Sequence, residues 1–99
     1  RLIDFDFNIK VVNEAFLGLV NLSEKQVVGR KCYDVFYGDL CNTDKCPVVR
    51  LRKNPKKKYV VETVKQNPSG KRVPLQLTAI LFNDSENNPM GIVEDLSDL

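Results

Sequence analysis

The chain has no histidine and no tryptophan, and its 99 residues include one methionine and three cysteines. Without histidine, a haem cannot be held by a histidine ligand. No apolar run approaches the length that spans a bilayer, so we expect no membrane contact by this stretch. The sequence also lacks a phosphate-binding loop, an acidic metal pair and a nucleophile beside a general base. These absences predict that the stretch itself is not an enzyme.

Length and composition are those of one ordinary globular domain covering residues 1–99. The sequence begins at Arg1 rather than at methionine, so we expect a piece excised from a longer protein, whose other domains could carry a kinase, cyclase or ATPase activity. Three cysteines, an odd number, suit a reducing, cytoplasmic compartment better than a secreted disulfide scaffold.

A basic run places six positive charges within nine residues. Its members are Arg50, Arg52, Lys53, Lys56, Lys57 and Lys58. Such a run can attract phosphate or nucleic acid. It can also be the solvated end of a helix, where cations complement the helix dipole. Because no DNA-reading motif accompanies the run, we favour the second interpretation and expect no direct nucleic-acid partner.

The three cysteines, Cys32, Cys41 and Cys46, are spaced C-x8-C-x4-C and leave three interpretations open. They can pack as small apolar residues in the interior. They can ligate a metal or an iron–sulfur cluster, although three thiolates are one ligand short and the fourth would be Asp39, Asp44, water or a second chain. We predict that they form no closed metal site in the isolated domain.

The third interpretation is thiol redox chemistry. Cys46 directly precedes Pro47, a residue favoured at the first position of a helix, and a helix N-terminus activates a thiol. We therefore expect Cys46 to be the most reactive thiol, with a reversible disulfide to Cys41 if the two approach closely.

The first half of the sequence predicts two short strands and several short helices. The strands lie on either side of Asn8, and Asn13 is placed to cap the helix that follows. Ser23 and Gln26 have the spacing of a capping box, and Gly29 ends that second helix. One further turn of helix, 33–36, is interrupted at Gly38 and Asp39, and a last helix runs from Pro47 to Asn54-Pro55.

The second half predicts three strands joined by hairpins. The first covers 59–64, and the turn 67–70 connects it to a strand with a strict apolar alternation at Val73, Leu75, Leu77, Ala79 and Leu81. We expect this set to face the helices, and the last strand, Met90 to Leu96, to pair with Leu2 to Phe5. The fold class is α+β, with a five-stranded antiparallel sheet and short helices on one face.

Two apolar residues of the long strand and four acidic residues lie outside this pattern. Ile80 and Phe82 fall on the opposite face of their strand, which is weak evidence for a contact surface. The acidic residues at four positions are read as surface charges and turn formers. These are Asp4, Asp6, Glu94 and Asp95.

With its elements in this order, the sequence resembles a PAS domain, over nearly its whole length. The matching segments are DFNIKVVNEAF, LSEKQVVGRKCYDVF, PSGKRVPLQLTA and the closing GIVEDLSDL. The segment containing Gly29, Arg30, the three cysteines and Pro47 is similar to a subset of the family with the pattern G-R-x-C…C…C-P. The resemblance implies a sensory module in a histidine kinase, diguanylate cyclase, chemoreceptor or transcription activator.

The resemblance also implies how such a module would work. It would bind a small, so far unknown ligand or sense redox state, pass the signal through Asp95, Leu96 and Ser97 to an effector domain of the same chain, and form a homodimer. A cysteinyl–flavin adduct is not expected, because Leu40 and Asn42 flank Cys41 where the flavin branch has a different motif. The alternative function is a ligand-free dimerisation module with a filled core.

Overall fold

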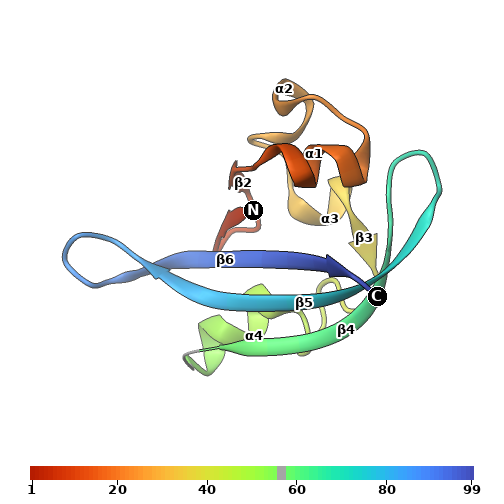
Figure 1. Cartoon of the computed structure of the whole chain (residues 1–99). Coiled ribbons are helices and arrows are strands. Elements are labelled where there is room, and N and C mark those ends of the chain that lie inside the picture. Colours follow the sequence, from red (N-terminus) through yellow and green to blue (C-terminus); the bar gives the residue numbers. More distant parts are fainter. Residues whose placement is uncertain (56–57) are drawn as a thin grey trace.

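The computed structural model describes residues 1–55 and 58–99, so Lys56 and Lys57 of the basic run lie outside the described residues. One antiparallel sheet organises the chain, with strand order β2-β1-β6-β5-β4-β3 (Figure 1). The strands are β1 (Leu2–Asp4), β2 (Ile9–Val11), β3 (Tyr37–Gly38), β4 (Tyr59–Gln66), β5 (Arg72–Asn83) and β6 (Pro89–Asp98). The helices are α1 (Glu14–Val20), α2 (Glu24–Val27), α3 (Cys32–Val35) and α4 (Pro47–Lys53).

The predicted pairing of the first strand with the last is confirmed. β1 lies beside β6, with Ile3 opposite Ile92. The predicted register of the long strand is confirmed as well, because Leu75, Leu77 and Ala79 are each at most 1% exposed. These side chains form the inner face of the sheet and carry most of the hydrophobic stabilisation of β5.

The sheet has six strands rather than the five predicted. The extra strand is β3, in which Tyr37 pairs with Gln66 and Gly38 with Lys65 at the edge of β4. Two residues contain no alternation that sequence analysis can detect. The glycine that suggested a break is needed for close approach, since a Cβ on Gly38 would lie 2.7 Å from the carbonyl oxygen of Val64.

The local signals of the helices are confirmed. The side-chain oxygen of Asn13 accepts a hydrogen bond from the backbone N–H of Phe16 at 2.9 Å, and that of Gln26 accepts one from the N–H of Ser23 at 2.9 Å. Gly29 has φ +87°, a conformation that favours glycine. Pro47 is the first residue of α4, so its missing N–H removes no helical hydrogen bond.

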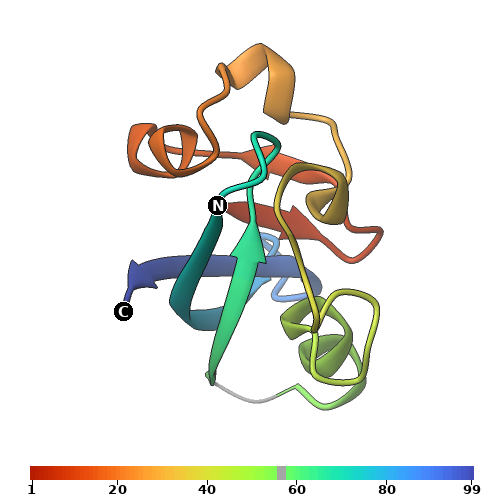
Figure 2. The same ribbon diagram turned by 90° about the vertical axis from the view of Figure 1, so that its right-hand side faces the viewer.

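The helices pack on the inner face of the sheet and enclose one hydrophobic core. Buried residues from α1, α3, α4 and the segment after α3 meet there, among them Phe16, Val35, Phe36, Val48 and Leu51. Figure 2 shows β4 and β6 running in clearly different directions, so the sheet is strongly twisted. α4 lies against β6 and β5, beside the hollow described below.

Part of the basic run makes contacts with other segments of the fold. The guanidinium of Arg50 lies 5.1 Å from the centre of the Tyr59 ring, and Arg52 donates to the carbonyl of Phe5 at 3.1 Å. Within the described ranges no helix has the length and apolarity that a membrane span requires.

The close approach of β1 to Gly91 of β6 predicts a sensitive position. A Cβ on Gly91 would lie 2.1 Å from the carbonyl oxygen of Ile3, whereas a Cβ on Gly18 of α1 would meet nothing within 4 Å. We expect Gly91→Ala to lower the free energy of unfolding by at least about 2 kcal/mol, because β1 must move away from β6. Gly18→Ala, the matched control, should raise it by about 1 kcal/mol through helix propensity. Urea denaturation of both variants measures the difference, and equal effects would contradict the packing of β1 on β6.

Candidate functional site

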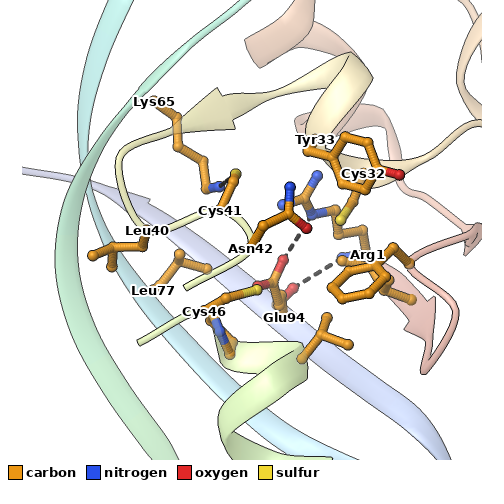
Figure 3. Close-up of a pocket in the computed structure, with 14 residues that line it drawn as sticks. Arg1, Cys32, Tyr33, Leu40, Cys41, Asn42, Cys46, Lys65, Leu77 and Glu94 are labelled. Carbon is orange, nitrogen blue, oxygen red and sulfur yellow. Dashed lines mark hydrogen bonds and ion pairs between the residues drawn. The ribbon is translucent and has the colours of Figure 1, made fainter. Parts of the chain in front are cut away.

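All three cysteines line one small cavity between the inner face of the sheet, α3, α4 and the loop 39–46 (Figure 3). Its volume is about 10 Å³, which is room for about one water molecule. Its charged lining residues are Arg1, Lys65 and Glu94. The cavity thus combines thiols with buried ionic groups, an arrangement that sequence analysis did not predict.

Glu94 corrects one prediction directly. The sequence suggested a surface charge, but the residue is 4% exposed and its carboxylate accepts a hydrogen bond from Nε of Arg1 at 2.7 Å. Both side chains are 2% exposed, so the ion pair is fully buried. The Arg1 guanidinium also lies 5.0 Å from the centre of the Phe16 ring, which covers one of its faces. Asp4, by contrast, is the predicted turn former, accepting from the N–H groups of Asp6 and Asn8 at 2.9 Å.

Lys65 supplies a second buried cation. It is 5% exposed, and its Nζ donates to the carbonyl of Phe36 at 3.3 Å and contacts Sγ of Cys41 at 3.6 Å. Lys65 was not among the residues predicted from the sequence to have a role. The signal that could have found it is strand phase, because Tyr59, Val61, Thr63 and Lys65 occupy alternate positions of β4. Glu94 could have been found in the same way, since it alternates with Ile92 on the inner face of β6.

The three thiols differ in their surroundings. Cys32 and Cys46 are each 6% exposed, whereas Cys41 is partly exposed, and all three are free. The predicted position of Cys46 as N-cap of α4 is confirmed, but its burial disfavours the expected high reactivity. Sγ of Cys41 accepts a hydrogen bond from the N–H of Gly38 at 3.3 Å in addition to its contact with Lys65. We now expect Cys41 to react first.

Burial dominates the acidity of Cys32. Desolvation raises the pKa of its thiol from the ordinary value of 9.0 to about 11. Glu94 and Cys46 act in the same direction, while the charges of Arg1 and Lys65 oppose it. Cys32 is therefore a protonated thiol at neutral pH.

The residues present do not fit a large cofactor or a closed metal site. A volume of about 10 Å³ is far below the several hundred Å³ of an organic ligand pocket, so a flavin or a haem does not fit this arrangement. Within residues 1–55 and 58–99, no group of three or more Cys, Asp or Glu side chains is placed to hold a metal ion.

Comparison with known proteins assigns the family. The profile described as a PAS domain matches residues 2–98, which is nearly the whole chain. The chain belongs to the PAS domain family. PAS domains are in general sensory modules without catalytic activity of their own, and that coarse role applies to this chain. No curated protein matches it in sequence.

Solved structures show the same fold at low sequence identity. A PAS domain from Colwellia psychrerythraea is similar with a TM-score of 0.80 and 15% identity, over 99% of this chain and 82% of that one. The PAS domain of nitrogen regulation protein NR(II) from Vibrio parahaemolyticus has a TM-score of 0.75 and 16% identity, over 99% and 85%. The light-state dimer of the fungal blue-light photoreceptor Vivid has a TM-score of 0.74 and 22% identity, over 98% and 74%.

The raised pKa of Cys32 predicts a loss of stability at alkaline pH. The folded chain holds this proton more tightly than the unfolded chain, so the stabilisation is complete below pH 9.0 and is lost as the pH rises towards about 11. Two pKa units correspond to about 3 kcal/mol. We expect Cys32→Ala to lack this part of the alkaline decline, although it is less stable at pH 7. Cys41→Ala, which keeps Cys32, should retain it. Denaturant titrations between pH 7 and pH 11 measure both, and identical pH profiles for the wild type and Cys32→Ala would contradict the assignment.

Proposed function

We propose that this PAS domain senses redox state or a small ligand at the thiol-lined cavity, in a reducing, cytoplasmic setting. It passes the signal to an effector domain of the same chain. The effector is a histidine kinase, diguanylate cyclase, chemoreceptor or transcription activator, as the resemblance implies. The segment from Gly29 to Pro47, with its G-R-x-C…C…C-P pattern, is the sensing part of this proposal.

The position of Glu94 on β6 carries the proposal. Its carboxylate faces the cavity that the three cysteines line, while the next residue, Asp95, is exposed on the other side of the strand. A chemical change at the cavity that alters the Arg1–Glu94 pair therefore acts on the strand that contains Asp95, Leu96 and Ser97. These three residues are the proposed output segment, and the change can bias it only if the two states differ in their interactions with the cavity.

Oxidation at Cys41 is the redox form of this signal. A hydroperoxide would convert its thiol to a sulfenic acid, with the oxygen transferred to sulfur and an alcohol or water released. A second cavity thiol, Cys32 or Cys46, would then displace water and form a disulfide. The partial exposure of Cys41 supports its role as the entry point.

Hydrogen exchange tests this proposal. After one equivalent of hydrogen peroxide, we expect peptic peptides of β6 to exchange faster, because oxidation at the cavity disturbs the Arg1–Glu94 pair. Peptides of α2, which does not line the cavity, are the internal control. Cys41→Ser should abolish the change in β6.

Peptide mass spectrometry shows in the same sample whether Cys41 is oxidised. Complete oxidation of Cys41 with unchanged exchange in β6 would refute the coupling of the cavity to the output segment.

The alternative function, dimerisation, is favoured by the outer face of the sheet. Ile80 of β5 is 44% exposed and lies directly opposite Val93 of β6, which is 36% exposed. Val60 on β4 is 47% exposed and extends the apolar surface. We propose that the parent protein is a homodimer through this face.

Sedimentation of the chain extended at both ends tests the dimer. We expect a dimer at micromolar concentration, and Ile80→Glu should dissociate it, because a buried unpaired carboxylate is unfavourable. Gln26→Glu adds the same charge at an exposed position of α2, away from this face, and should leave a dimer in place. A wild-type chain that stays monomeric when extended would count against this function.

A further inference from the structure

The Arg1 guanidinium has an unused hydrogen-bond donor in the interior. Its Nε is paired with Glu94, but Nη1 is buried and has no hydrogen-bond partner among the described residues. Figure 3 shows the head group directed to the cavity that Tyr33 and Asn42 also line. A buried donor without an acceptor is unfavourable, so the site favours an incoming acceptor.

The second cation of the cavity lacks a carboxylate. Within the described ranges, no carboxylate oxygen lies within 4.0 Å of Nζ of Lys65. Its contacts there are the neutral carbonyl of Phe36, the ring of the same residue and the sulfur of Cys41. Arg1 and Lys65 thus bring two positive charges to the cavity, and Glu94 brings one negative charge. These three charged residues are almost entirely buried, so the lining carries one excess positive charge that solvent screens poorly. An anion would neutralise it.

The size of the cavity restricts the class of anion. A volume of about 10 Å³ is room for about one water molecule, so the largest ion that the cavity admits is a monatomic anion in place of that water, and organic carboxylates and phosphates are excluded in this arrangement. A second hollow beside Arg1, of about 60 Å³, is lined by Glu94 and Asp95 and by no cation other than Arg1, so its lining carries no excess positive charge. The excess positive charge therefore favours the thiol-lined cavity over the second hollow as the anion site. The small volume of that cavity restricts the anion to a small ion.

We propose that the cavity between Arg1 and Lys65 binds a small monovalent anion of about the size of chloride. The anion accepts the unused hydrogen bond of Arg1 and balances the charge of Lys65. This inference rests on the proposed sensory function in one respect, because it names a ligand class for the same cavity. Binding itself requires no effector domain and no oxidation.

Two measurements test the anion site. In crystals grown without halide and soaked in sodium bromide, we expect an anomalous peak in the cavity, in contact with Arg1 Nη1 or Lys65 Nζ. In solution, sodium chloride should raise the melting temperature of the wild type more than sodium methanesulfonate does at equal ionic strength, because the larger anion does not fit.

Variants separate the site from general salt effects. Lys65→Gln should weaken the chloride effect by about tenfold or more in apparent affinity, because it removes a charge-assisted contact. Lys71→Gln removes an exposed cation from β5's flanking turn and should behave as the wild type. A cavity without bromide, or equal stabilisation by both salts in all three proteins, would overturn the proposal. The hydrogen-exchange response to peroxide is measured without halide. Its result therefore tests the proposed sensory function separately from the anion site.

Discussion

The contact between Arg1 and Glu94 is the constraint on which the inner architecture depends. The carbonyl of Arg1 accepts the backbone N–H of Glu94 at 2.8 Å, and the side chains form the buried ion pair at 2.7 Å. The backbone hydrogen bond continues the pairing of β1 with β6, while the two side chains line the cavity. Such a pair adds little net stability, but loss of one partner would leave a charge buried without compensation. The same two residues therefore determine both the pairing of β1 with β6 and the charge balance of the cavity.

Much of the fold could be predicted because each element carries its own local signal. Asn13, Ser23 with Gln26, and Pro47 mark helix starts by side-chain chemistry that requires no tertiary context. The alternation of β5 fixed its buried face for the same reason. β3 could not be predicted, because two residues become a strand only when β4 offers an edge to them.

The candidate site was only half predictable. The cysteines stood out in the sequence, but the spacing C-x8-C-x4-C does not determine that Cys41 contacts Lys65 or that Cys32 is desolvated. The charged residues of the cavity were missed because charge suggests solvent, whereas strand phase placed Glu94 and Lys65 on the inner face. A charged residue at a strand position that faces the core is a more specific sign of a functional site than the residue type alone.

The pairing of β1 with β6 has a consequence for the order of folding. Hairpins such as β4–β5 and β5–β6 join neighbouring segments and can form early, whereas the contact from Arg1 to Glu94 closes a loop over 93 positions of sequence. Loop closure of this length is slow relative to hairpin formation, because the chain loses entropy before the contact stabilises it. The cavity is therefore completed late, after the sheet centre exists. Its chemistry becomes available only after β1 and β6 have paired, so a chain that has not yet been synthesised as far as Glu94 cannot bind or respond there.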